Sequence, residues 1–199
     1  MVTHHTRTAR WIVTGERGVG KTTFCRRLKE TAGAAGWDVA GLLSLPRYEG
    51  EVKTGIHILD LREGASRLMA STQPTEVEGF RFCGWTFSDS ALAWGNDILR
   101  RATPCDLLIV DEVGPLEFDV GSGMTACFQE LDREAYHVAI AVVRPAYVDR
   151  FRLSWKRSTS ITISSPEQAL ELAEARFAEF QHPIRNPSPK APRLRDQQS

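Results

Sequence analysis

Hydrophobic residues gather in four short runs along the chain, each of a length that suits a buried strand. The runs are Trp11–Val13, Val39–Leu43, Leu107–Val110 and Val138–Val143. Continuous apolar runs of this kind, without alternation of apolar and polar residues, are typical of strands that are covered on both faces of a parallel sheet. We therefore expect the four runs to form the centre of one sheet.

The segments between these runs have the periodicity of amphipathic helices. After the first run, Phe24, Leu28 and Ala32 recur every four residues and mark one apolar stripe. Similar stripes lie within Met124–Leu131 and Leu170–Phe180. Strands that alternate with helices predict an α/β fold, here a three-layer sandwich with a mainly parallel central sheet.

Residues 46–87 break this alternation. Gly55–Arg62 and Phe80–Phe87 have the character of strands, and pairs of turn residues separate them. We expect an antiparallel extension of the sheet around this region. The following segment, Asp89–Arg101, has helical character and returns the chain to the strand that begins at Leu107.

The loop after the first run carries the most specific motif. Gly15 to Thr22 fits G-x-x-x-x-G-K-[ST], the phosphate-binding Walker A pattern, with a predicted strand before it and a predicted helix after it. Glycines let the loop aim many backbone N–H groups at the phosphates, and the helix start adds its positive end. The candidate nucleotide-binding residues are Gly15, Glu16, Arg17, Gly18, Val19, Gly20, Lys21, Thr22 and Thr23.

Two side chains of this loop have specific tasks in such a site. The Lys21 ammonium can reach the β- and γ-phosphates and is a candidate catalytic residue, and the Thr22 hydroxyl can bind Mg²⁺. A second candidate metal ligand is Asp111, which ends the apolar run Leu107–Val110. The next residue, Glu112, is the candidate that orients or deprotonates the attacking water. Strand ends of this kind face the ligand crevice in open α/β sheets.

An acidic pair after a strand is by itself more often a solvated turn than a catalytic pair, and the loop at 15–22 is what favours the catalytic interpretation. Arg144 follows the run Val138–Val143, which places it near the same sheet edge as Asp111. It is a candidate sensor of the γ-phosphate. The alternative, an arginine exposed to solvent at the end of a strand, is common because most arginines lie on the surface.

Several of these segments resemble the small single-domain P-loop nucleoside-triphosphatases of thermophilic microbes, known in animals as the cancer-related NTPase. The matching segments are Val13–Thr23, the run Val39–Leu43, Thr54–Ile56 and, most specifically, Ile109–Glu117. The last is similar to the family's pattern of Asp-Glu, a small hydrophobic residue, Gly, two variable residues and Glu. The resemblance covers roughly residues 10–180.

The resemblance implies that the protein hydrolyses NTP to NDP and phosphate, with broad tolerance for the base, on a RecA- or kinase-like sheet. It also makes Glu117 a further candidate site residue. Arg17 departs from the family pattern, where many members have Pro. The arginines that the family carries after its penultimate strand do not align cleanly with Arg144 or Arg150, so no residue is assigned as an arginine finger.

The composition of the chain restricts the kinds of partner that we expect. Lys plus Arg is 25 and Asp plus Glu is 25, and this zero net charge argues against a protein that coats nucleic acid. No stretch approaches the roughly 20 apolar residues of a spanning helix, so we expect no membrane attachment and a cytoplasmic location. The four cysteines form no C-x-x-C pair and are expected to be buried, reduced thiols.

The chain is predicted to contain one domain, residues 1–181, and a disordered tail, 182–199, rich in Pro, Arg and polar residues. Nucleoside triphosphate and Mg²⁺ are the expected substrate and cofactor, and no pattern indicates an oligomeric state. Two other functions stay open. One is a small kinase for a nucleoside, nucleotide or nucleic-acid end. The other is a nucleotide-binding adaptor or switch, although the chain lacks a guanine-reading Asn-Lys-x-Asp motif.

Overall fold

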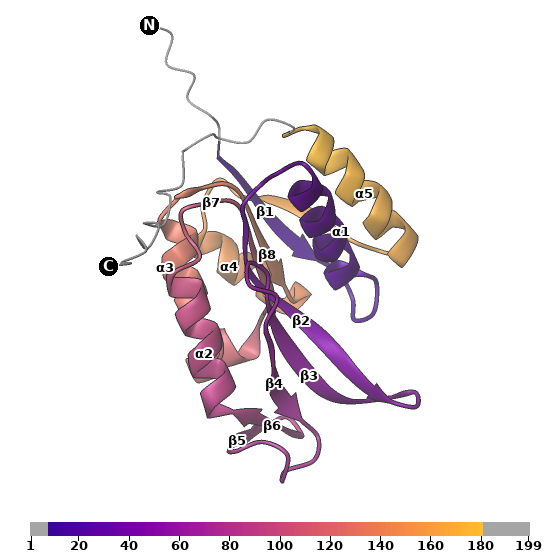
Figure 1. Cartoon of the computed structure of the whole chain (residues 1–199), viewed down its shortest axis with the longest axis vertical. Coiled ribbons are helices and arrows are strands. Elements are labelled where there is room, and N and C mark those ends of the chain that lie inside the picture. The colour runs from indigo at the N-terminus through magenta and orange to yellow at the C-terminus, as the bar shows by residue number, and fades with distance from the viewer. Residues whose placement is uncertain (1–7, 181–199) are drawn as a thin grey trace, which may run out of the picture.

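A computed structural model describes residues 8–180 of the chain. The predicted tail, residues 182–199, lies outside the described residues, and the domain boundary at 181 stays a prediction. The described residues build one nine-stranded sheet with helices on both of its faces (Figure 1). The predicted α/β sandwich with a mainly parallel centre is therefore confirmed.

The strand order is β5-β6-β4-β3-β2-β7-β8-β1-β9, and the strands from β2 to β9 in this order run parallel to one another. Four of these parallel strands contain the predicted apolar runs, whereas the fifth, β9, is short and too polar to show one. The five are β2 (Val39–Glu49), β7 (Cys105–Val113), β8 (Tyr136–Val143), β1 (Ala9–Thr14) and β9 (Thr159–Thr162).

The antiparallel extension lies on the far side of β2, as predicted. Strand β2 is parallel to β7 only over its first residues and then pairs with antiparallel β3. The tips of β2 and β3 form an arm that projects beyond the rest of the sheet (Figure 1). The remaining strands of the extension are also antiparallel. They are β3 (Val52–Asp60), β4 (Ser66–Ser71), β5 (Gly79–Phe82) and β6 (Trp85–Ser88).

One predicted strand is wrong. Phe80–Phe87 is not continuous but forms the hairpin of β5 and β6, with Cys83 and Gly84 at its turn. Both turn residues have positive φ, 48° and 81°, as a tight two-residue hairpin turn requires. The sequence hides this turn because Cys83 is not a usual turn residue and apolar residues flank it on both sides.

Each face of the sheet has its own apolar layer because side chains alternate along the strands. On β7, Leu107 and Ile109 pack in one layer and Leu108 and Val110 in the other. The first layer is covered by α1 (Lys21–Ala34) and α5 (Pro166–Ala178). The second is covered by α2 (Asp89–Arg100), α3 (Ala126–Asp132) and α4 (Val148–Ser154). Two short helical turns, Leu116–Val120 and Pro145–Tyr147, complete the described elements.

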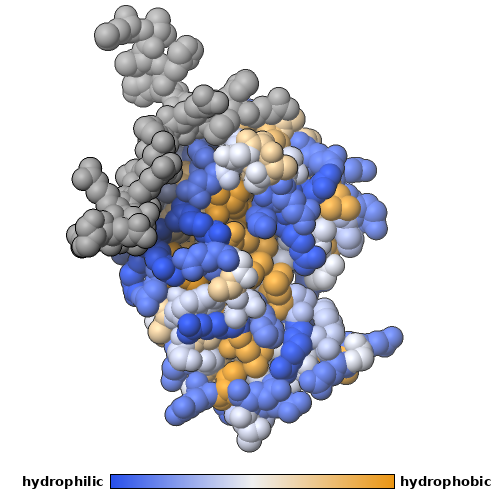
Figure 2. All heavy atoms as spheres, in the orientation of Figure 1, coloured by the Kyte–Doolittle hydropathy of each residue, from blue (hydrophilic) through white to orange (hydrophobic). Residues whose placement is uncertain are grey.

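Hydrophilic side chains cover most of the visible surface, and apolar residues show through in a band along its middle (Figure 2). Within residues 8–180, no helix is both long and apolar enough to cross a membrane. The four cysteines are free thiols. Cys25 and Cys127 are buried as expected, but Cys105 is only partly buried and Cys83 is exposed because it lies at the hairpin turn.

Candidate active site

The candidate residues meet at the carboxyl ends of the parallel strands. The Walker A loop follows β1, the acidic pair ends β7, and Arg144 follows β8. Strand β8 lies between β1 and β7 in the sheet. Arg144 therefore enters the same sheet edge between the loop and the acidic pair. Thr22 and Asp111, which are 89 residues apart in sequence, come into contact there.

The Walker A loop is shaped by close contact with the end of the chain's last strand. A Cβ on Gly15 would lie 2.2 Å from the Ile163 carbonyl oxygen, just beyond β9, so this position accepts only glycine. Gly18 differs, because a Cβ there would meet no atom within 4 Å, but its φ is +85°. The loop backbone at Gly18 is thus open to solvent, together with the exposed Glu16 and Arg17.

Lys21 begins α1 and folds back over the loop. Its Nζ donates hydrogen bonds to the carbonyl oxygens of Gly15, at 2.7 Å, and Glu16, at 2.6 Å. Burial lowers the pKa of Lys21, and the negative charges of Asp111 and Glu112 oppose this shift. The ammonium therefore lies between the loop and the acidic pair, where it can face a bound phosphate. Thr23 continues the first turn of α1, and Val19 packs partly against the core below the loop.

Asp111 makes direct contact with the loop's helix. Its Oδ2 accepts hydrogen bonds from the Thr22 hydroxyl, at 3.0 Å, and from the backbone N–H of Ser44 on β2, at 3.1 Å. Burial, helped by the adjacent Glu112, raises the pKa of Asp111 to about 7. A cation beside this carboxylate would favour its charged form. The two predicted metal ligands, Thr22 and Asp111, are thus brought together.

A β-bulge in β7 makes the side chains of Asp111 and Glu112 point in different directions. Val110 pairs with Ala141 and Val113 with Val143, so β7 has two residues where β8 has one. Glu112 occupies the bulge with a φ of +72°, a left-handed conformation that is uncommon for residues other than glycine. Bulges re-aim side chains next to active sites. This one lets Asp111 face Thr22 while Glu112 stays half-exposed at the sheet edge.

Arg144 contacts Glu112 rather than solvent alone. Its Nη2 lies 3.2 Å from Glu112 Oε1, and its stem passes over Gly114, where a Cβ would lie 3.2 Å from Arg144 Cδ. The two side chains keep 54% and 32% of their surface exposed. Exposed pairs of this kind contribute only about 0–1 kcal/mol, so Arg144 and Glu112 can separate readily when another charge enters.

Glu117 has a different environment from the other candidates. Its buried carboxylate accepts hydrogen bonds from the backbone N–H groups of Gly114, at 2.8 Å, and Met124, at 2.9 Å. Burial raises its pKa, and these two bonds oppose the shift. Glu117 therefore joins the loop that follows Glu112 to the segment before α3, and among the described contacts it acts on the loop backbone.

Replacing Glu117 with Ala is expected to destabilise the fold. Two buried N–H groups would lose their acceptor, at about 1–3 kcal/mol each, which lowers the melting temperature by roughly 5–15 °C. Thermal unfolding followed by circular dichroism measures the change. Asp119→Asn is the matched control, because Asp119 lies on the same turn but pairs with Arg150 at the surface. A melting temperature equal for Glu117→Ala and wild type would contradict this role.

Two groups beside the site have no signature in the sequence. The Ser44 contact comes from a backbone N–H, which any residue except proline provides. Lys53 lies on β3, in a region interpreted only as an extension of the sheet. Its charge interacts with those of Glu112, Arg17, Arg144 and Asp111. A lysine within a predicted strand does not indicate which charges surround it. Those neighbours become visible only when the pairing of β2 with β3 is known.

Comparison with known proteins agrees with this geometry. The NTPase family model matches residues 10–166. A protein of Methanopyrus kandleri named nucleoside-triphosphatase THEP1 is 30% identical over 179 residues, which is 83% of this chain and 97% of that protein. The THEP1 of Thermococcus kodakarensis is 31% identical over 146 residues, covering 72% of this chain and 80% of the relative.

Two solved structures share the fold. The human cancer-related nucleoside triphosphatase superposes with a TM-score of 0.67 at 20% identity, covering 88% of this chain and 98% of that one. THEP1 from the hyperthermophile Aquifex aeolicus gives a TM-score of 0.62 at 20% identity, with 87% and 99% covered. The family model spans most of the chain and includes both the Walker A loop and the acidic strand end. This chain therefore belongs to the NTPase family.

Proposed function

We propose that this protein hydrolyses ATP, GTP and other nucleoside triphosphates to the diphosphate and phosphate, with Mg²⁺ as cofactor. The observation that carries the proposal is the hydrogen bond from the Thr22 hydroxyl to Asp111, the residue before Glu112 in the sequence. Hydrolysis is also the activity in the names of the THEP1 relatives. We also propose a cytoplasmic location, where Mg²⁺ and NTP would be available to such an enzyme.

The residues present fit a magnesium ion. Thr22 and Asp111 offer a hydroxyl and a carboxylate oxygen 3.0 Å apart, and Mg²⁺ prefers oxygen ligands. Residues 8–180 contain no group of three or more His, Cys, Asp or Glu that could hold a metal. That is compatible with magnesium, which usually takes one or two protein ligands together with substrate phosphates and water. Bound Mg²⁺ would neutralise charge on the β- and γ-phosphates.

The protein groups divide the remaining work. The loop N–H groups and Lys21 would bind the phosphates, for which Lys21 would exchange its carbonyl partners for phosphate oxygens. Glu112 would orient a water molecule and accept its proton as the water oxygen bonds to the γ-phosphorus. The bond between the γ-phosphorus and the bridging oxygen breaks, and NDP leaves. Arg144, released from Glu112, would face the charge that develops on the transferred phosphoryl group.

The first experiment is phosphate release from ATP, GTP, CTP and UTP without any added acceptor. We expect turnover of all four nucleotides with Mg²⁺ and loss of at least about 90% of the rate in excess EDTA, because charge neutralisation at the phosphates is then missing. EDTA followed by restored Mg²⁺ is the control for irreversible damage. Release that appears only when a nucleoside or nucleotide acceptor is added would replace hydrolysis with a kinase activity.

A further inference from the structure

The arm formed by the tips of β2 and β3 extends from the sheet (Figure 1), and β2 itself contacts the candidate active site. Strand β2 passes the acidic pair at Ser44, whose N–H contacts Asp111, and continues to Glu49 before the chain returns in β3. Lys53 is the second residue of β3 and pairs with Tyr48 on the arm. Because Tyr48 is four residues beyond Ser44, Lys53 lies on the arm just past the point at which β2 contacts Asp111.

Lys53 is held in an unusual place for a lysine. It is half-buried, and its Nζ lies 5.6 Å from the centre of the Trp85 ring on β6. Burial lowers its pKa, and among the surrounding charges Glu112 opposes that shift most strongly. The charges with the next largest effects on this pKa are those of Arg17, Arg144 and Asp111. Apart from burial, the charges with the largest effects on the pKa of Lys53 thus belong to the candidate site.

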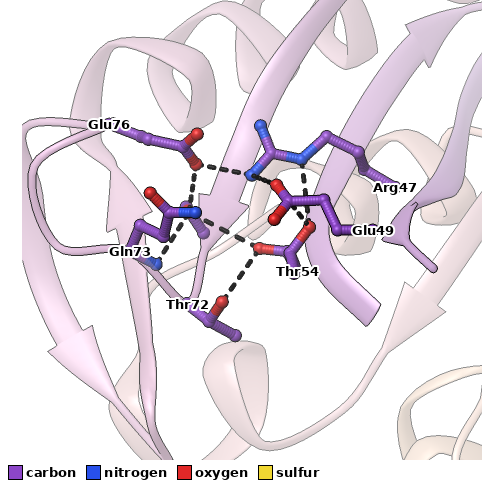
Figure 3. A network of polar contacts seen from close by, with 7 residues as sticks. Arg47, Glu49, Thr54, Thr72, Gln73 and Glu76 are labelled. Atoms are coloured by element: carbon purple, nitrogen blue, oxygen red, sulfur yellow. Dashed lines mark hydrogen bonds and ion pairs between the residues drawn. The ribbon is translucent and has the colours of Figure 1, made fainter. Parts of the chain in front are cut away.

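The root of the arm is fixed by a network of polar contacts (Figure 3). Arg47 on β2 contacts Glu76 at 2.5 Å and the Thr54 hydroxyl at 3.4 Å. The Thr54 carbonyl oxygen accepts hydrogen bonds from the N–H and the hydroxyl of Thr72, beyond β4. Thr54 directly follows Lys53, so the network holds the backbone from which Lys53 projects. A fixed backbone lowers the cost of presenting a side chain to a ligand.

Four cations gather around this edge. The charged groups that act on Lys21 and Lys53, together with these lysines, comprise four cations and three carboxylates: Lys21, Lys53, Arg17 and Arg144, with Asp111, Glu112 and Glu16. One of those carboxylates, Asp111, is already bound to Thr22 and Ser44. Cations that are grouped in this way attract a ligand of the opposite charge. A triphosphate is such a ligand.

We propose that Lys53 is a second phosphate-binding lysine, which leaves the Trp85 ring and contacts the terminal phosphate of a bound NTP from the β3 side. The inference rests on the proposed function and adds to it. The arm becomes part of the active site, and the terminal phosphate is recognised from two sides, by Lys21 of α1 and by Lys53 of β3. NDP lacks the group that Lys53 contacts, so Lys53 distinguishes substrate from product.

The test compares equilibrium binding of a non-hydrolysable ATP analogue and of ADP, both with Mg²⁺, to wild type and Lys53→Ala. We expect affinity for the analogue to fall roughly 10- to 100-fold, as loss of a hydrogen bond to a charged group does, and affinity for ADP to change less than about threefold. Lys53→Arg keeps the charge and should restore most of the preference for the triphosphate.

The matched control is Arg67→Ala, which removes another cation of the sheet extension from a tryptophan ring, Trp94, at 4.7 Å. It should leave the affinities for both nucleotides unchanged. Equal losses for the ATP analogue and ADP in Lys53→Ala, or no loss, would overturn the Lys53 proposal while hydrolysis by wild type still supports the proposed function. A wild type that neither binds nor hydrolyses NTP would overturn both. Circular dichroism of each variant verifies that it is folded.

Discussion

Replacing Glu112 with Gln should leave NTP binding intact and slow the chemical step by about 10²–10⁴-fold, the range for a positioned general base. The glutamine keeps the shape of the side chain and lacks its negative charge and basicity. The fold should tolerate the change, because the ion pair of Glu112 with Arg144 is largely exposed. Lys21, Thr22 and Asp111, the proposed phosphate-binding and metal-binding residues, remain.

Single-turnover hydrolysis and equilibrium binding of a labelled NTP separate the two effects. The Glu112→Gln variant should hold the triphosphate without converting it. Asp111→Asn is the informative comparison, because Asp111 accepts hydrogen bonds from the Thr22 hydroxyl and the Ser44 N–H. It should weaken nucleotide affinity and the response to Mg²⁺ together. Near-normal hydrolysis by Glu112→Gln would remove Glu112 from the mechanism and favour the kinase or the switch.

The parts of the fold that the sequence predicts best are those set by local patterns. Buried parallel strands are apolar throughout, so runs such as Leu107–Val110 are visible without any knowledge of their neighbours. The antiparallel extension is also recognisable, from the change in pattern after residue 46. The Phe80–Phe87 hairpin is not recognisable in the sequence. Its turn depends on the positive φ of Cys83, and a cysteine does not indicate a turn.

The candidate site also has parts that local sequence patterns predict and parts that depend on the assembled sheet. The Walker A loop and the Asp111–Glu112 pair are contiguous motifs, so the sequence alone names them, and the structure brings them to one edge. The bulge that gives Glu112 its direction depends on the pairing of β7 with β8. The neighbourhood of Lys53 depends on how β2 and β3 run past that edge. Both are properties of the assembled sheet, which no local pattern in the chain records.

Glu117 shows that a sequence motif does not determine the role of each of its residues. The resemblance over Asp111–Glu117 makes Glu117 a candidate site residue beside Asp111 and Glu112. In the structure, only Asp111 and Glu112 lie at the sheet edge with the Walker A loop, whereas Glu117 binds the N–H groups of Gly114 and Met124. Spacing along the chain places a carboxylate near a loop, but burial and partners decide whether it faces a ligand or the backbone.

The second large effect is expected for Lys21→Ala, which should lower affinity for NTP by at least about 100-fold, because it removes the cation proposed to face the β- and γ-phosphates. Stability should change little. The bonds that Lys21 donates go to the Gly15 and Glu16 carbonyl oxygens of the loop, and water can take its place there. Lys21→Arg should not restore binding, because a planar guanidinium does not replace a compact ammonium in a tight loop.

Binding of the labelled NTP with Mg²⁺, together with thermal unfolding, tests this expectation. Lys29→Ala is the matched control, since Lys29 lies on the same helix but eight residues further from the loop. Its affinity for NTP should equal that of wild type. Comparing Lys21→Ala with Lys53→Ala adds a further distinction. Lys21 is proposed to face the β-phosphate as well, so its loss should weaken ADP binding, whereas loss of Lys53 should spare it. If Lys21→Ala bound and hydrolysed NTP like wild type, the Walker A loop would not be the site.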